Sequence, residues 1–349
     1  LGERIYDEDG SFTEHDSQLL IAKLNSKTRK THWGLSIFAQ DENYVRNLEN
    51  FKGGNYSHLR VESDRQDAGM CLFANFLPIH KIFISTGMNL KSGLVNGRDV
   101  YQTSTDMVIN KGKISSAEMF LQSKFSLLDE KFHILAGVNY NHSYLFDAGF
   151  YVENSTSATS FMNDFAGDLD DNMFSNFSLN TGVRYNLGKY FSLWSSVNKG
   201  FNAPTLEDMT RSGLMRFGFK IANPKLQSEY LTNINAGLGF FSKSLNLSFN
   251  GNYNQGKGFI YYVETGETIF GGSRNIIQKQ NITHVELINL SADFDFNYKS
   301  LKFFANATYN NSKILEFNEN PELEGKMLMY SPLYNANAGI SAKISIYNI

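Results

Sequence analysis

One stretch of this chain, residues 211–220, combines cationic and aromatic side chains in a single polar segment. Guanidinium groups donate hydrogen bonds in a fixed geometry, and aromatic rings offer flat apolar surface. The combination suits recognition of a small ligand more than bond-making chemistry. A later segment with paired tyrosines, followed by Phe270, is a second candidate. The predicted ligand-contact residues are Arg211, Arg216, Phe217, Phe219, Tyr261 and Tyr262.

Acidic residues crowd a second polar segment, which contains Asp164, Asp168, Asp170 and Asp171. Carboxylate oxygens are ligands that Ca²⁺ takes in proteins, but the spacing of these four does not match an EF-hand loop. A solvated acidic loop is therefore the preferred interpretation, with a calcium site as the alternative.

No arrangement of residues in the sequence indicates catalysis. The seven His are scattered without the spacing of paired metal ligands, and Cys71 is the only cysteine. A single cysteine excludes an intrachain disulfide framework and a multi-Cys metal site. The order Ser-His-Asp, a Gly-rich phosphate loop and a metalloprotease motif are not found. We therefore expect a protein that is not an enzyme and has no cofactor.

The segments around these loops alternate apolar and polar residues over long distances. From Phe177 to Leu187 the odd positions are mostly apolar or aromatic, while Asn and Ser prevail at the even positions. Since successive side chains of a strand point to opposite faces, the pattern predicts strands with one apolar and one polar face. The same alternation occurs at residues 245–254, 287–298, 301–310 and 336–346, and less regularly at 17–26, 30–41, 65–77, 81–92, 114–127 and 132–146.

The connections between the predicted strands are alternately short turns and long polar stretches. Tight connections at 77–80, 128–131, 188–189, 242–244 and 299–300 are each followed, one hairpin later, by a polar stretch of roughly ten to twenty-five residues. A barrel that crosses an outer membrane has short periplasmic turns, long extracellular loops and aromatic girdles, and tyrosines here fall toward strand ends. Soluble β folds are the alternative, although their strands usually run only ~5–6 residues.

Composition supports the membrane barrel and excludes other classes. The 349 residues carry a net charge of −3 and no basic run, which argues against nucleic acid as a partner. No stretch approaches the ~18–20 consecutive apolar residues of a membrane helix, and no signal peptide is visible. The chain divides into about thirteen strands. Because bacterial single-chain barrels have an even number of strands, we expect an incomplete transmembrane β-barrel.

Two proline motifs flank the 211–220 segment. The strand before it runs into Gly200-Phe201-Asn202-Ala203-Pro204-Thr205-Leu206, and the strand after it follows Asn223-Pro224-Lys225-Leu226-Gln227-Ser228-Glu229. Each proline can end a hydrogen-bonded ladder at the barrel rim, and Glu229 adds a carboxylate near the loop base. At this separation the pair resembles the TonB-dependent outer-membrane receptors. The positions that carry the resemblance, with a structural role, are Gly200, Phe201, Ala203, Pro204, Asn223, Pro224 and Glu229.

The resemblance implies an antiparallel barrel of 22 strands around a plugged lumen in the bacterial outer membrane. Receptors of this kind bind a scarce nutrient (an iron chelate, cobalamin, haem or an oligomer) at the extracellular loops. Energy delivered by TonB with ExbB and ExbD then acts on the plug, so that the nutrient is imported. The implied partners are this complex, a small ligand, and outer-membrane lipid and lipopolysaccharide; a surface lipoprotein is a further candidate.

The chain departs from the family pattern in three respects: it contains no plug domain, no energy-coupling box and no closing strand with a terminal aromatic residue. We therefore expect residues 1–349 to be part of the barrel domain, about 13 of 22 strands. The alternative function is a passive porin or a structural barrel in a protein complex, which a full-length sequence without a plug would favour.

Overall fold

The computed structural model describes residues 10–215, 217–317, 321–328 and 331–343, which form one 16-stranded β-sheet with little helix. Thirteen of these strands are long and three are short, so the described sheet has more strands than the roughly thirteen predicted from the alternation. The long strands are β1 (Phe12–Lys27), β2 (Thr31–Lys52), β3 (Asn55–Ile79), β4 (Ile82–Tyr101), β5 (Met107–Leu127), β6 (Phe132–Glu153), β8 (Asn172–Leu187), β9 (Phe191–Asn202), β12 (Glu229–Phe241), β13 (Leu245–Ile269), β14 (Arg274–Tyr298), β15 (Leu301–Glu316) and β16 (Tyr334–Ala342). The short elements are β7 (Gly167–Asp168), β10 (Gly213–Met215), β11 (Gly218–Ile221), helix α1 (Leu206–Thr210) and the 3-10 helices η1 (Ser160–Phe165) and η2 (Pro321–Leu323).

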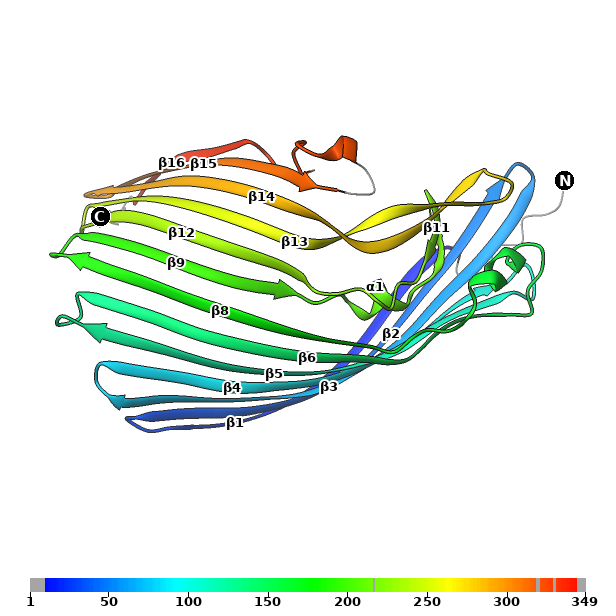
Figure 1. Cartoon of the computed structure of the whole chain (residues 1–349), viewed down its shortest axis with the longest axis horizontal. Helices are drawn as coiled ribbons and strands as arrows, with labels where there is room; N and C mark the ends of the chain where they lie inside the picture. Colours follow the sequence, from blue (N-terminus) through cyan, green and yellow to red (C-terminus); the bar gives the residue numbers. More distant parts are fainter. Residues whose placement is uncertain (1–9, 216, 318–320, 329–330, 344–349) are drawn as a thin grey trace, which may run out of the picture.

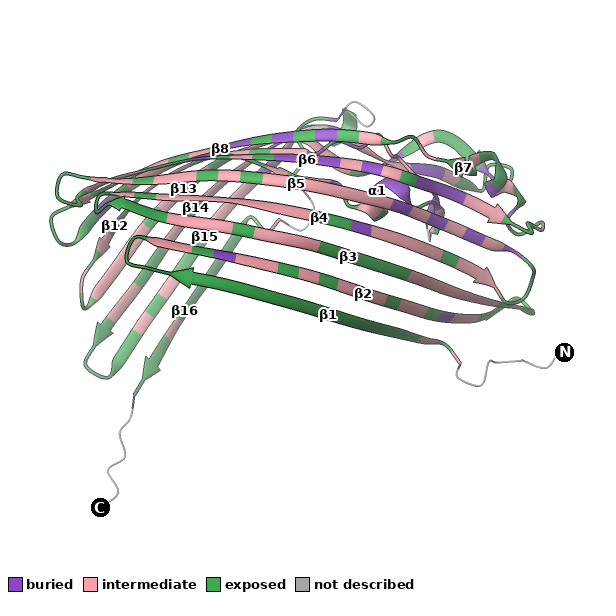
Figure 2. Cartoon of the chain, turned by 90° about the horizontal axis from the view of Figure 1, so that it is seen from below, coloured by how far each residue is buried: buried purple, intermediate pink, exposed green. Residues whose placement is uncertain are grey.

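Each long strand pairs antiparallel with the next long strand of the chain, so the sheet is a series of hairpins. It curves into an open trough (Figure 1, Figure 2). Within the described ranges, β1 pairs only with β2 and β16 pairs only with β15. The all-β antiparallel class is thus confirmed, with a single parallel pairing among the described strands, between β11 and β14.

Tight turns gather at one end of the trough, on the left in Figure 1, and the long connections lie at the other end. The turn between β5 and β6 places Leu128, Asp129 and Glu130 at positive φ, and the turn between β14 and β15 does the same with Lys299. The predicted separation is therefore present in part: the described connections at the first end are all short, but the β2–β3, β4–β5 and β13–β14 connections at the other end are short as well. The short-turn end is the periplasmic side of such a barrel, and the other end is extracellular.

Several strands are much longer than the sequence pattern predicted. β3, β13 and β14 each have 25 residues, which at ~3.3 Å per residue is about 80 Å. A tilted strand crosses a bilayer in ~9–11 residues. Much of the sequence predicted to be polar loop is strand that continues beyond the membrane. For example, β2 and β3 stay paired up to the two-glycine turn Gly53-Gly54, in which both residues have positive φ.

The apolar face of the sheet is exposed and the polar face lines the trough. On β8, Phe177 and Leu179 are each 51% exposed, while Asn176 and Ser178 on the opposite face are buried. Figure 2 shows the same alternation of burial along the strands. Exposed apolar side chains in a continuous band need lipid around them, so the predicted orientation of the two faces is confirmed.

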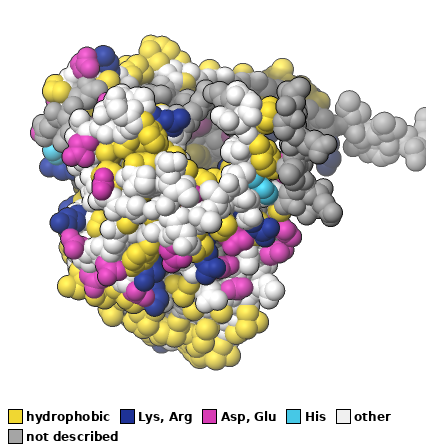
Figure 3. Space-filling model, turned by 90° about the vertical axis from the view of Figure 1, so that its right-hand side faces the viewer, with side chains coloured by type: hydrophobic (Ala, Val, Ile, Leu, Met, Phe, Trp, Pro, Cys, Tyr) yellow, Lys and Arg dark blue, Asp and Glu magenta, His cyan; other side chains and the backbone are white. Residues whose placement is uncertain are grey.

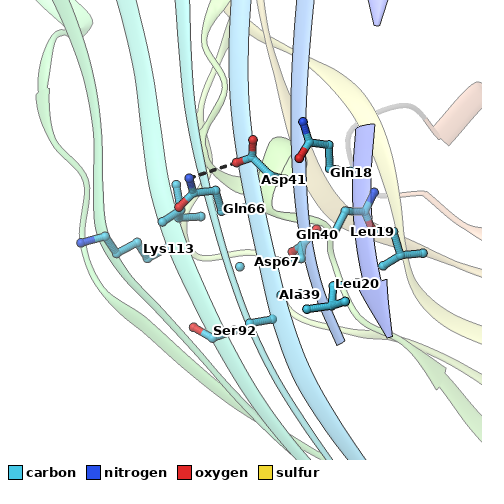
Figure 4. A pocket seen from close by; sticks show the side chains of 13 residues that line it. Gln18, Leu19, Leu20, Ala39, Gln40, Asp41, Gln66, Asp67, Ser92 and Lys113 are labelled. Atoms are coloured by element: carbon cyan, nitrogen blue, oxygen red, sulfur yellow. Dashed lines mark hydrogen bonds between the residues drawn. The ribbon is translucent and has the colours of Figure 1, made fainter. Parts of the chain in front are cut away.

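The upper limit of the apolar band is visible on β1 to β5 (Figure 4). One row of paired residues runs Gln18, Asp41, Gln66, Leu94 and Lys113 across the strands, and a second row on the same face runs Leu20, Ala39, Ala68 and Ser92. Gln66 donates to Asp41 across 3.0 Å. The two rows border a shallow hollow of about 610 Å³. Four of the five side chains in the first row are polar, whereas three of the four in the second row are apolar, as expected where the apolar band ends.

Helices contribute nothing to the crossing of a bilayer in the described part of the chain, since none is long and apolar enough to span one.

Candidate functional site

The connection between β9 and β12, residues 203–228, folds inward over the extracellular end of the trough. Its first part is α1, which begins at Thr205 with a capping box: Asp208 N donates to Thr205 Oγ1 (3.2 Å) and Thr205 N donates to Asp208 Oδ2 (3.3 Å). The helix buries Met209 completely against Leu145 and Ala148 of β6. Pro204 and Thr205 therefore start the helix that anchors this connection to the opposite wall.

The second part of the connection, β11, pairs in parallel with β14 along the edge that β15 leaves free. An unpaired strand edge is a liability that proteins cover, and β11 covers this one. Phe219 of β11 is fully buried, with its ring 5.3 Å from those of Phe161 and Phe165. The connection thus bridges the trough from β5 and β6 to β14.

A cluster of charges lines the inner side of this bridge. Arg211 Nη1 lies 2.9 Å from Glu207 Oε1, and Lys279 of β14 forms an ion pair with Asp208. Lys220, which is only 5% exposed, donates from Nζ to the backbone carbonyl of Glu207 at 3.1 Å. Three cations and two carboxylates therefore meet at the mouth of the trough.

Burial shifts the titration of this cluster. Burial, and to a smaller extent the nearby Lys279 ammonium, together lower the pKa of Lys220 to about 8. Burial also raises the pKa of Asp99 on β4, which the positive charge of Arg211 only partly offsets. For Asp208, burial acts in the same direction, but the hydrogen bonds from Lys279 and Thr205 and the positive charge of Lys279 together outweigh it, and the pKa is lowered. Lys220 is therefore a cation in surroundings that disfavour its charge, whereas Asp208 helps to raise the pKa of Lys279.

Two exposed aromatic rings adjoin the cluster. The ring of Phe217 meets that of Tyr262 edge-on at 5.7 Å, and Lys279 Nζ lies 5.2 Å from the centre of the Tyr262 ring. Phe217 is 58% exposed and Tyr262 is 40% exposed. Cations and accessible rings together form a surface that binds a ligand through charge and stacking.

The predicted contact residues thus separate into different environments. Arg211, Phe217 and Tyr262 lie together, whereas Phe219 packs in the buried cluster and offers no surface to a ligand. Tyr261 lies on the face of β13 opposite to Tyr262, and its ring is 6.4 Å from that of Phe317. Arg216 lies outside the described residues. Ligand contact by this set stays a prediction, now centred on three of its members.

The motif residues have structural contacts. Glu229 accepts hydrogen bonds from Asn202 Nδ2 (2.9 Å) and from the backbone N–H of Ile260 (2.7 Å), and so joins β9, β12 and β13 at the loop base. Asn223 Nδ2 donates to the carbonyl of Lys279 at 2.8 Å. The motif therefore holds both ends of the bridging connection in place.

A second buried carboxylate joins the two neighbouring extracellular connections. Asp106 accepts hydrogen bonds from Ser104 Oγ (2.5 Å), from the N–H (2.8 Å) and Oγ1 (2.7 Å) of Thr156, and from Thr159 Oγ1. Burial alone would raise the pKa of Asp106, but these donors hold it well below its usual range. Asp106 thus fixes the β6–β8 connection to the β4–β5 turn.

The four aspartates considered for calcium do not converge. Tyr144 donates to Asp171 at 2.5 Å, Tyr151 donates to Asp168, and Asp170 lies 3.3 Å from Lys225; the fourth is Asp164. Among the described residues, no group of three or more His, Cys, Asp or Glu side chains is placed to hold a metal ion. Tyrosines and a lysine engage three of the four carboxylates in separate directions, so the described geometry gives a calcium site no support.

Two members of the charge cluster carry no sequence signal. Lys279 and Asp99 lie on extensions of β14 and β4 that the alternation did not mark as strand. Their approach to α1 depends on the inward fold of residues 203–228. Figure 3 views this end of the molecule, where charged side chains of both signs are mixed with hydrophobic ones.

A curved antiparallel sheet with an exposed apolar face, tight turns at one end and folded connections at the other defines an outer-membrane β-barrel protein. The family model described as TonB dependent receptor-like, beta-barrel matches residues 3–347. The chain therefore belongs to the TonB-dependent receptor β-barrel family, whose members are outer-membrane receptors and transporters, and the resemblance seen in the two motifs is confirmed.

Solved structures of this class are similar in fold. They include the ferric yersiniabactin uptake receptor FyuA from Yersinia pestis (TM-score 0.71, 12% identity, 96% of this chain and 48% of that chain). The copper transporter OprC (TM-score 0.69, 12% identity, 94% and 50%) and the ferric citrate transporter FecA (TM-score 0.67, 10% identity, 96% and 48%) are further examples. The chain spans about half the length of these proteins. No curated protein sequence gives a match.

Proposed function

We propose that this chain is part of the barrel of an outer-membrane receptor that imports a scarce nutrient with energy supplied through TonB. The observation that supports the proposal is the inward-folded connection 203–228, in which Arg211 pairs with Glu207 and Phe217 meets the ring of Tyr262 of β13. A charged constriction also occurs in passive pores, where it selects solutes, so dependence on TonB is what separates the two functions. A receptor needs such a surface to hold its ligand before transport.

The whole receptor in this proposal is larger than the chain. The backbone edges of β1 and β16 are unpaired within the described ranges, and unsatisfied N–H and C=O groups cost several kcal/mol each in lipid. Further strands that close the barrel, and a plug in its lumen, are consistent with similar structures of twice the length. TonB, ExbB and ExbD act through that plug, and the barrel wall supplies the path without catalysis.

Uptake by the full-length receptor tests the proposal. A strain that lacks the receptor gene is supplied in turn with iron chelates, haem, cobalamin and oligosaccharides as limiting nutrients, and its growth is compared with the complemented strain. We expect growth on one nutrient to require both the receptor and TonB. Growth that needs the receptor but is unchanged without TonB would identify a passive porin instead.

Variants of adjacent residues separate ligand contact from general damage. Tyr262→Ala removes a ring beside the charge cluster, and Tyr261→Ala removes its neighbour on the opposite face of β13. We expect Tyr262→Ala to raise the nutrient concentration for half-maximal growth about tenfold, as loss of a stacked ring does, with Tyr261→Ala close to wild type. Equal effects would remove this surface from the binding site.

A further inference from the structure

We infer that the ligand carries an anionic group that binds among Arg211, Lys220 and Lys279, beside a flat apolar portion that stacks on Tyr262 and Phe217. This inference rests on the proposed receptor function and specifies the chemistry of its ligand. It follows from the charges, their partners and their exposure at the bridge.

Lys220 is the centre of the argument. Its ammonium has three donors, and the single hydrogen bond from Nζ goes to a neutral acceptor, the carbonyl of Glu207. Among the described residues, no carboxylate lies within 4.0 Å of Lys220. A buried cation without a paired anion is costly, and an anionic ligand group would supply the missing partner.

The two flanking cations differ in how firmly they are engaged. The Arg211–Glu207 pair is exposed, with side-chain exposures of 49% and 67%, and exposed pairs of this kind contribute little. Arg211 can therefore exchange Glu207 for a ligand at small cost. Lys279 is 21% exposed and is held by Asp208, so it contributes its charge from a fixed position.

The nearby acids do not neutralise the cluster. Asp208 is engaged by Lys279, and Glu207 points its side chain to solvent with Arg211. Asp99 is buried, which favours its uncharged form and weakens it as a counter-ion for Arg211. The positive charge is therefore in excess on the inner side of the bridge, and the rings of Tyr262 and Phe217 border it.

The test uses a pair of probes that differ only in charge. Binding of 4-(trifluoromethyl)benzoate and of its uncharged amide, 4-(trifluoromethyl)benzamide, to the full-length receptor in zwitterionic detergent is followed by fluorine NMR. We expect the benzoate to bind more tightly than the amide. Lys220→Met should weaken benzoate binding about tenfold or more, as loss of a charged donor does, and should leave the amide unchanged.

The matched control is Lys225→Met, which removes one positive charge from the same connection. Lys225 is 77% exposed and pairs with the exposed Asp170 at 3.3 Å. We expect Lys225→Met to bind benzoate like wild type. The double variant Asp208→Asn/Lys279→Met keeps the net charge and leaves no unpaired partner; it should also weaken benzoate binding. Equal binding of benzoate and amide, or equal effects of Lys220→Met and Lys225→Met, would overturn the inference.

The pH dependence gives a second readout that a structural role of Lys220 would not produce. Lys220 is faced by Glu207, Asp208 and Arg211 from the α1 segment and by Lys279 from β14, and its pKa is about 8. Because the benzoate stays ionised, its affinity should fall as pH rises through this value and Lys220 loses its proton. The fall should be absent in Lys220→Met. TonB-dependent growth on a nutrient without benzoate binding would refute only the anionic ligand, whereas growth independent of TonB would refute the receptor proposal itself.

Discussion

Arginine introduced on the two faces of β8 tests the orientation of the barrel wall. Val183 is 41% exposed on the apolar face. It precedes the Gly188 turn by five residues, which at ~3.3 Å per residue and ~40° tilt is about 13 Å along the membrane normal. That depth is close to the middle of an apolar band ~25 Å tall, where an arginine costs ~2–4 kcal/mol. Val183→Arg should lose this much stability.

The matched change is Asn180→Arg on the lumenal face of the same strand. Asn180 lies opposite Gly137, where its own amide fills the space over the glycine, and its Oδ1 has no hydrogen-bond partner among the described residues. Little is lost, so we expect a change within about 1 kcal/mol. Denaturant unfolding of the full-length receptor in lipid vesicles, followed by the gel shift between folded and heated protein, measures both. Equal losses at the two positions would refute the assignment of faces.

Two further predictions concern the wall and the loops. Gly87→Ala should destabilise the barrel by about 1–3 kcal/mol, because the new Cβ would lie 2.5 Å from Cε1 of Phe120; Gly97→Ala on the same strand has 3.6 Å to its nearest atom and should be near neutral in the same unfolding assay. Asp106→Asn should speed proteolysis of residues 154–171 at neutral pH about tenfold or more. In the wild-type protein, the protection of residues 154–171 from protease is present above the usual carboxyl pKa and is lost only as pH falls through the lowered pKa of Asp106. A cleavage rate unchanged by Asp106→Asn would contradict the role of this carboxylate.

The membrane-crossing part of the strands was predictable because lipid imposes a strict period of two on the outer face. Leu179 and Val183 show it on β8. Beyond the bilayer both faces of a strand meet water, so the period disappears while the backbone ladder continues. Residues 42–64 read as a polar loop for this reason, yet they form the paired ends of β2 and β3.

Inward aromatic residues are the second feature that alternation missed. The lumenal face was expected to be rich in Asn and Ser, but Phe38 lies over Gly69 of the adjacent strand, and Trp194 lies in the same way over Gly237. A Cβ at either glycine would fall within 2.6 Å of the ring. Each ring thus fills the space of a missing side chain across the strand, a pairing that only the register reveals.

The binding surface was predictable only in part. Cations and rings in residues 211–220 indicated the correct connection, but the sequence does not show which rings turn inward to pack. Phe219 is buried because β11 pairs with the free edge of β14, and the same pairing brings Lys279 to the site. Deletion of the whole segment would therefore expose a hydrophobic cluster and a strand edge, so single substitutions are the cleaner test.

Contact of the apolar face with lipid is the central claim, and spin labels along β8 measure it most directly. With Cys71 replaced by Ser, nitroxides placed one at a time at residues 177–183 of the full-length receptor in vesicles report collisions with lipid-soluble oxygen and with a water-soluble nickel chelate. We predict high oxygen access at odd positions such as Leu179 and Val183, and low oxygen access at the even positions between them. No alternation, or oxygen access highest at the even positions, would contradict the account.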